Sequence, residues 1–137
     1  MEARKHTILL VDDDDALNYL HQRLLDISKF GNPVVTLENG KDALDAFLEM
    51  SKSLNEKDLV TVFLDINMPV MDGWEFLKEL KKMEHLLNFK HQIFMLSSSI
   101  NPDDIEKAED DSLVTKYISK PLSLGLLEEI KKDNMFL

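Results

Sequence analysis

Residues 62–73, "VFLDINMPVMDG", place a carboxylate directly after a strongly apolar run. Val62, Phe63 and Leu64 are typical of the end of a buried strand, and Asp65 follows them at once. A charge without a partner is costly inside a core. We therefore expect the strand to end at Asp65, so that the carboxylate lies at the carboxyl edge of a sheet rather than within it.

The rest of the chain alternates between two kinds of segment. Short apolar runs rich in β-branched residues predict strands at 7–11, 33–37, 60–64, 92–96 and 114–119. The segments between them carry apolar residues at intervals of three and four, which is typical of helices. Strand and helix in alternation, five times over, predict parallel strands joined by right-handed crossovers. The expected fold is a doubly wound α/β domain with helices on both faces of the sheet.

The apolar stripes are interpreted as the core faces of the predicted helices. In the first helix this stripe is Leu17, Leu20, Leu24 and Ile27. A later helix is expected to begin at Pro102, because proline suits the first helical position. Trp74 is expected to pack in or beside the third helix rather than to bind a ligand.

Composition excludes several classes of protein. A chain of 137 residues, 44% hydrophobic and 31% charged, fits one globular domain, and the absence of cysteine excludes disulfides and thiolate metal sites. A net charge of −10 disfavours nucleic acid and anionic membranes as partners. No run approaches the roughly 18 apolar residues of a membrane span, and the N-terminal apolar stretch is too short for export. The expected location is the cytoplasm.

Chemically useful side chains follow four of the five predicted strands. Asp12 and Asp13 come after the first strand, Asp65 after the third, Ser97 after the fourth and Lys120 after the fifth. In open parallel sheets, ligands bind at the carboxyl ends of the strands. Clustered carboxylates repel one another, so they take up protons or bind a cation, and oxygen ligands suit Mg²⁺. A carboxylate is also a possible nucleophile toward phosphorus.

Each of these residues alone also fits a structural role. Asp12 and Asp13 could cap the first helix, as is preferred for Asp14 and Asp15. Ser97 and Asp65 could be turn residues, and Lys120 a solvated lysine. Only the convergence of all of them on one edge of the sheet favours a functional site.

Four segments, "ILLVDDD", "FLDINMPVMDG", "MLSSS" and "YISKP", resemble the signatures of the receiver domain of two-component response regulators, in the family's order. The resemblance implies a flavodoxin-like sheet of five parallel strands in the order 2-1-3-4-5, flanked by five helices. It covers nearly the whole chain, so we expect one stand-alone receiver over residues 1–137, with a core of about 6–133 and no effector domain.

The resemblance also implies the site. Asp65 would be the phosphoacceptor, attacking the phosphohistidine of a sensor histidine kinase or phosphotransfer protein. The cofactor would be Mg²⁺, bound directly by Asp13, Asp65 and the main-chain carbonyl of Asn67, with Asp12 acting mainly through water.

Further roles follow from the same resemblance. Ser97 would be the hydroxyl switch that moves toward the phosphoryl group, and Lys120 would contact that group, with a cis bond to Pro121. Tyr117 would be the aromatic switch. Output to an unknown protein is expected through the fourth helix, fifth strand and fifth helix, roughly residues 102–132. The domain would assist its own phosphorylation and slow dephosphorylation without being an enzyme, as a monomer or weak homodimer.

Rival interpretations explain the sequence less well. A haloacid-dehalogenase-like phosphatase has a second acid two residues after its nucleophile, where this chain has Asn67. A flavodoxin-like cofactor binder needs a phosphate loop where this chain has four aspartates, at 12–15. An EF-hand interpretation of the same aspartates fails because Ala16 replaces a ligand. A pseudo-receiver that acts only as an interaction module remains open, although such domains usually lose an acid or the lysine.

Overall fold

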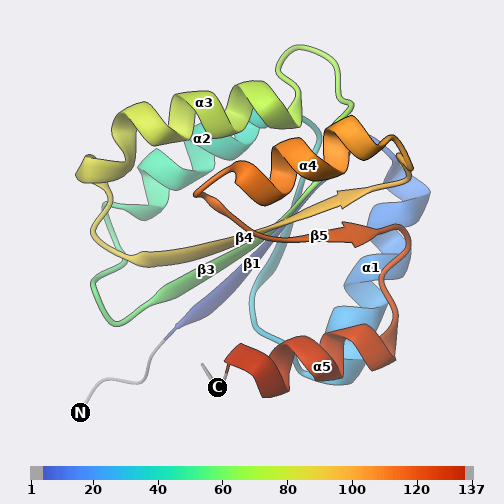
Figure 1. The fold of residues 1–137 in the computed structure, drawn as a ribbon. Helices are drawn as coiled ribbons and strands as arrows, with labels where there is room; N and C mark the ends of the chain where they lie inside the picture. Colours follow the sequence, from blue (N-terminus) through green and yellow to red (C-terminus); the bar gives the residue numbers. More distant parts are fainter. Residues whose placement is uncertain (1–4, 135–137) are drawn as a thin grey trace.

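The computed structural model describes residues 5–134 and contains one parallel sheet with helices on both faces (Figure 1). The strand order is β2-β1-β3-β4-β5, which confirms the predicted fold and strand order. Residues 1–4 and 135–137 of the expected domain lie outside the described residues. The elements are β1 His6–Val11, α1 Asp15–Ser28, β2 Val34–Leu37, α2 Gly40–Met50, β3 Leu59–Leu64, α3 Gly73–Met83, a 3₁₀ turn η1 Glu84–Leu86, β4 Lys90–Ser97, α4 Pro102–Asp110, β5 Val114–Ser119 and α5 Leu124–Asn134.

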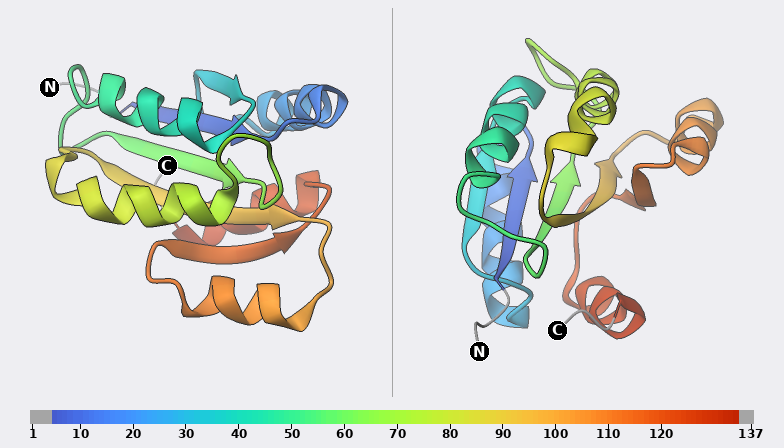
Figure 2. Two further views of the ribbon diagram at one scale, coloured as in Figure 1. Left: turned by 90° about the horizontal axis from the view of Figure 1, so that it is seen from above. Right: turned by 90° about the vertical axis from the view of Figure 1, so that its left-hand side faces the viewer.

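The sheet separates two hydrophobic cores because successive strand residues point to opposite faces. In β3, Val62 and Leu64 pack under α2, α3 and α4, whereas Phe63 packs on the other side with residues of α1 and α5. Figure 2 shows the two layers of helices from above and from the side. Every residue of β3 is buried, which explains its continuous apolar sequence.

The predicted core face of α1 is only partly right, because Leu24 packs against the core but two other members of the stripe do not. Leu20 is 45% exposed and Ile27 is 60% exposed, whereas Leu25 is completely buried. The inner face of the helix instead carries Asn18 and His21, both buried and hydrogen-bonded. A pattern built from apolar residues alone assigns such polar positions to solvent, so the predicted stripe is rotated away from the true core face.

Element boundaries differ little from those predicted. Strand β4 is longer than expected at both ends, β1 and β3 each begin one residue earlier, and β2 begins one residue later, at Val34. Helix α4 begins at Pro102 as predicted, and the Asn101 side chain accepts a hydrogen bond from Asp103 N. Within residues 5–134, no helix is both long enough and apolar enough to cross a membrane.

Candidate functional site

Three aspartates meet at the carboxyl edge of the sheet. Val11 and Leu64 are paired at the ends of adjacent strands, so the residues that follow them, Asp12 and Asp65, are neighbours. Carboxylate oxygens of Asp12, Asp13 and Asp65 all lie within 4.8 Å of one another. Asp12 and Asp65 are buried, whereas Asp13 is exposed. The structure therefore brings together the three acids that the sequence predicted to converge.

Main-chain groups hold the two buried carboxylates. Asp12 Oδ1 accepts a hydrogen bond from Asp14 N at 3.0 Å, and Asp65 Oδ1 accepts one from Ile66 N at 2.8 Å. The loop after Asp65 folds back on itself, because Gly73 N donates to Ile66 O at 2.8 Å. A Cβ atom on Gly73 would overlap the main-chain oxygen of Asp65, so only glycine fits this close approach.

Lys120 connects the two buried acids. Its Nζ lies 2.8 Å from Asp12 Oδ2 and 3.3 Å from Asp65 Oδ1. Burial alone would lower the pKa of Lys120, but the hydrogen bonds and charges of the two carboxylates outweigh it and raise the pKa. The lysine is therefore a fixed positive charge at this edge. Its peptide bond to Pro121 is cis, as the family resemblance implies.

The charge on Asp65 is only partly offset. Burial and the nearby charge of Asp12 raise the pKa of Asp65 from 3.8 to about 6, and Lys120 opposes that rise. A second cation beside the acids would remove the remaining repulsion. Three carboxylates are oxygen donors of the kind that Mg²⁺ prefers, so the acid cluster fits that ion. The Asn67 backbone belongs to the loop directly after Asp65, and its side chain is exposed.

Ser97 and Tyr117 are both hydrogen-bonded to Ser99, in the loop that follows β4. Ser97 is buried, and its Oγ accepts a hydrogen bond from Ser99 N at 3.0 Å. Ser99 Oγ donates to Asp104 Oδ2 at 2.8 Å in α4, and the hydroxyl of Tyr117 donates to Ser99 O at 2.8 Å. Ser99 thus links the site to both α4 and β5. Lys120 N also donates to Ser97 O at 3.0 Å, which keeps β5 beside β4 at the site.

Sequence reasoning missed two residues that support this site from α1. Asn18 Nδ2 donates to Asp12 O at 2.8 Å, and His21 Nε2 accepts from Leu122 N at 3.1 Å, just after the Lys120-Pro121 bond. Burial lowers the pKa of His21, and the charge of Asp12 opposes this, so the ring is a neutral acceptor. One feature of the sequence pointed to them. Asn18 and His21 are polar and lie about one helical turn apart, on a helix that begins next to the acid cluster.

Comparison with known proteins gives one consistent family. A family model described as the response regulator receiver domain matches residues 8–132. The "Probable methanogenesis regulatory protein FilR2" of Methanothrix harundinacea is 33% identical, over 91% of this chain and 81% of that protein. Response regulator Rcp1 of Synechocystis is 30% identical, over 85% of this chain and 78% of that protein. The chain spans only 17% of the sensory/regulatory protein RpfC of Xanthomonas campestris, at 29% identity.

Solved structures agree with these matches. A two component response regulator from Cytophaga hutchinsonii superposes with a TM-score of 0.78 at 27% identity, covering 96% of this chain and 97% of that one. The phosphorylated cyanobacterial phytochrome response regulator RcpA gives a TM-score of 0.67 at 33% identity, covering 96% and 91%.

Proposed function

The chain belongs to the response regulator receiver domain family, and from this premise we propose that Asp65 accepts a phosphoryl group from a phosphohistidine. The observation that carries the proposal is the convergence of three acids and Lys120 on one edge of the sheet. One similar protein, RcpA, is described as phosphorylated, which supports this chemistry for the family. We propose that the protein acts in the cytoplasm.

The transfer itself is a single displacement at phosphorus. An oxygen of Asp65 forms the new P–O bond as the P–N bond of the phosphohistidine breaks, and the imidazole leaves with its electron pair. Lys120 stands 3.3 Å from Asp65 Oδ1, where its positive charge offsets the charge of the phosphoryl oxygens. The Ile66 N–H orients the carboxylate through its hydrogen bond to Oδ1.

Asp12, Asp13 and Asp65, with the main-chain carbonyl of Asn67, are the residues proposed to hold Mg²⁺. When bound, the ion neutralises charge on the carboxylates and on the phosphoryl oxygens. Asp12 already shares Lys120 with Asp65, so its main task is to hold the lysine and to act on the metal through water. Asp13, which is exposed, has the freedom to turn its carboxylate toward an incoming ion.

We further propose that phosphorylation changes the surface built by α4, β5 and α5. Ser97 would move toward the phosphoryl group, and this movement would break or shift its hydrogen bond with Ser99. Because Ser99 also bonds Asp104 and Tyr117, the change would pass to α4 and β5 together. The partner upstream is a histidine kinase or phosphotransfer protein, and the downstream partner is a protein that distinguishes the two states.

The test is to incubate the protein with Mg²⁺ and acetyl phosphate and to measure its intact mass. The wild type is expected to gain one phosphoryl group that is stable in acid and labile in base. Asp65→Asn should gain none, because it lacks the nucleophile. Asp14→Asn is the matched control: it lies in the same acidic run but caps α1, so its phosphorylation should be unchanged.

Three results would contradict the proposal. If the wild type gains no adduct, the protein is better explained as a pseudo-receiver that binds partners without accepting a phosphoryl group. An equal adduct on Asp65→Asn would move the acceptor to another residue. Turnover of phosphate monoesters without an adduct would favour a phosphatase.

A further inference from the structure

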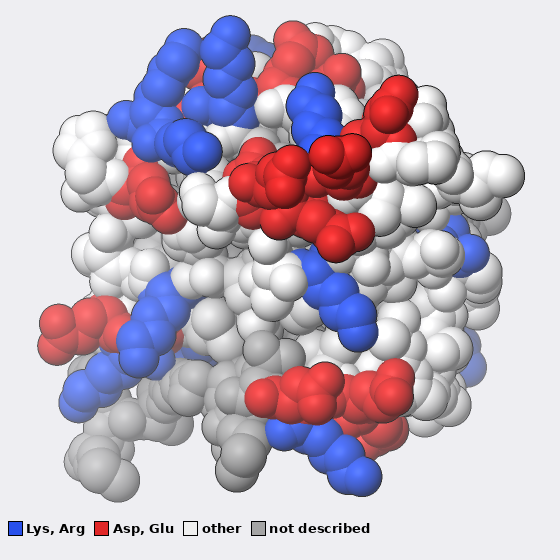
Figure 3. Space-filling view, in the orientation of Figure 1, with Lys and Arg blue, Asp and Glu red and all other residues white. Residues whose placement is uncertain are grey.

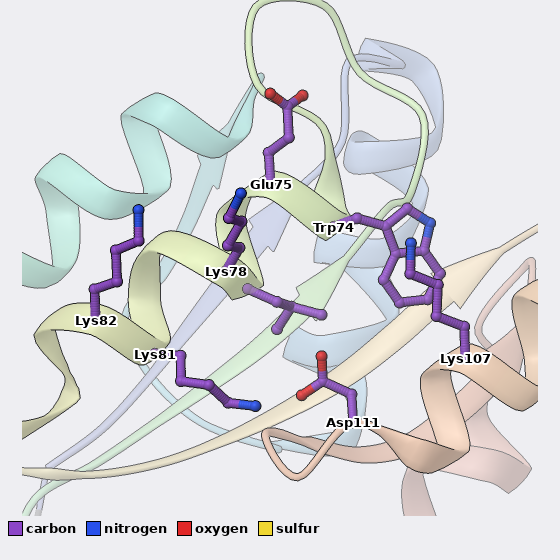
Figure 4. A pocket seen from close by; sticks show the side chains of 8 residues that line it. Trp74, Glu75, Lys78, Lys81, Lys82, Lys107 and Asp111 are labelled. Atoms are coloured by element: carbon purple, nitrogen blue, oxygen red, sulfur yellow. The ribbon is translucent and has the colours of Figure 1, made fainter.

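A groove of about 660 Å³ lies between α3 and α4, and none of the three clustered aspartates lines it (Figure 4). Its size is within the usual range for small-molecule sites. Trp74 and the buried Leu77 contribute apolar surface, and four lysines surround it: Lys78, Lys81, Lys82 and Lys107. No part of the proposed phosphorylation chemistry uses these residues.

The lysines of the groove are only partly neutralised. Lys82 pairs with Glu79 at 3.4 Å, but Lys78 and Lys81 form no ion pair among residues 5–134. Lys107 Nζ lies 4.4 Å from the centre of the Trp74 ring, so it faces an aromatic surface instead of a carboxylate. In a chain with a net charge of −10, this is an unusual concentration of cations.

The two acids that line the groove are already engaged. Glu75 Oε1 accepts a hydrogen bond from Asp72 N in the capping box of α3, and Figure 4 shows its side chain pointing away from Trp74. Asp111 Oδ1 accepts a bond from Leu113 N at 2.9 Å. Lys81 points toward Asp111 in Figure 4 but forms no ion pair with it. The lining therefore has more positive than negative charge available to a ligand.

The surroundings limit the size of that ligand. Asp103, Glu106 and Asp110 line a neighbouring depression on α4, and Figure 3 shows acidic side chains gathered over this helix beside the lysines of α3. A long polyanion such as a nucleic acid strand would have to cross these carboxylates, which repel it. Lys81 and Lys107 also line that depression, whereas Lys78 and Lys82 line only the groove, so a small anion bound in the groove need not enter the depression.

We propose that this groove binds a nucleotide with its base against Trp74 and its phosphates on the lysines. The indole ring provides a stacking surface for a base, and lysine ammonium groups are common phosphate ligands. Lys107 would move from the Trp74 ring to the phosphates, since its exposed contact with the ring is weaker than base stacking. Trp74 packs partly against the core, as the sequence predicted, and its remaining surface lines the groove. Our proposal differs from the sequence-based prediction in giving this surface a ligand.

Trp74 is the only tryptophan of the chain, so its fluorescence reports on the groove directly. The experiment titrates unphosphorylated protein in EDTA with ADP and with GDP, and compares adenosine and inorganic phosphate. We expect saturable quenching by at least one of the diphosphates at concentrations below about 1 mM, and at least tenfold weaker binding of adenosine or phosphate alone. No saturable quenching by either nucleotide, or equal binding of phosphate alone, would overturn the proposal.

Variants distinguish nucleotide binding in the groove from general attraction to surface lysines. The double variant Lys78→Gln/Lys81→Gln should weaken binding at least about tenfold, whereas Lys41→Gln, on the exposed surface of α2, should not. Equilibrium dialysis with labelled ADP or GDP should show reduced binding to Trp74→Leu, with circular dichroism confirming its fold. If both the Lys78→Gln/Lys81→Gln variant and Trp74→Leu bind the nucleotide as tightly as the wild type does, the proposal is overturned. Asp65→Asn should bind as the wild type does, so this test is independent of the proposed phosphorylation.

Discussion

Two buried aspartates respond to their surroundings in opposite ways. Burial and the charge of Asp12 raise the pKa of Asp65 to about 6. Asp58 accepts hydrogen bonds from Lys5 N and Asn55 N, both at 2.9 Å, and the first of these bonds is the main cause that lowers the pKa of Asp58. The surroundings of Asp65 thus oppose its ionisation, whereas those of Asp58 favour it.

Asp65→Asn is expected to stabilise the protein in EDTA at neutral pH. A folded pKa above the ordinary 3.8 means that Asp65 takes nothing from the stability of the wild type below pH 3.8, and that its ionisation lowers this stability as the pH rises through about 6. The variant does not ionise, so its advantage should be absent near pH 4 and reach on the order of 1–3 kcal/mol above pH 7. Urea unfolding across this range measures the difference.

The control for this prediction is Asp58→Asn, whose effect should have the opposite sign. The lowered pKa of Asp58 means that its contribution to stability is present above pH 3.8 and is lost as the pH falls through the folded pKa. The variant should therefore be less stable than the wild type at neutral pH. If Asp65→Asn also destabilises the protein at pH 7, the described balance of charge at the site is wrong.

At the scale of the element, helix α1 shows why a hydrophobic pattern can mislead. We expect Leu25→Ala, at a completely buried position, to cost about 2–5 kcal/mol of unfolding free energy. Ile27→Ala, where the side chain is 60% exposed, should change stability by no more than about 0.5 kcal/mol. Chemical denaturation compares the two. Similar losses of unfolding free energy in both variants would mean that Ile27 faces the core, as the sequence predicted.

Two glycines at the beginnings of helices provide a second matched pair. Gly73→Ala should destabilise the protein by more than about 1 kcal/mol, because the new Cβ would overlap Asp65 O unless the loop moved. At Gly125 in α5, a Cβ atom would have no neighbouring atom within 4 Å, so Gly125→Ala should be neutral or stabilise by up to about 1 kcal/mol. Thermal unfolding of both variants measures the contrast, and a stabilising Gly73→Ala would contradict the close packing of this loop.

At the scale of the whole molecule, the fold was predictable from the sequence because a parallel sheet has a simple signature. Apolar runs such as 60–64 predicted the strands, and the residues after them, such as Asp12 and Asp65, met at one edge as expected. Asn18 and His21 were not predictable in the same way. Their partners are a main-chain oxygen and a distant main-chain N–H, which no periodicity in the sequence records.

Binding of Mg²⁺ should raise the stability of the whole domain. A ligand that binds only the folded state at ten times its Kd adds about 1.4 kcal/mol. Asp13→Asn should lose most of this gain without harming the fold, because Asp13 is exposed. Asp14→Asn should keep it. Thermal unfolding with and without Mg²⁺ measures each shift, and an equal shift in Asp13→Asn would remove Asp13 from the metal site.

The most direct test of the central claim locates the phosphorylated atom without any mutation. Wild-type protein is treated with Mg²⁺ and acetyl phosphate and then with borohydride, which reduces an aspartyl phosphate to homoserine. Peptide mass spectrometry then finds the reduced residue. We predict homoserine at position 65 and only when the phosphodonor is present. Homoserine at position 12 or 13 instead, or at no position, would contradict the assignment of Asp65 as the phosphoacceptor.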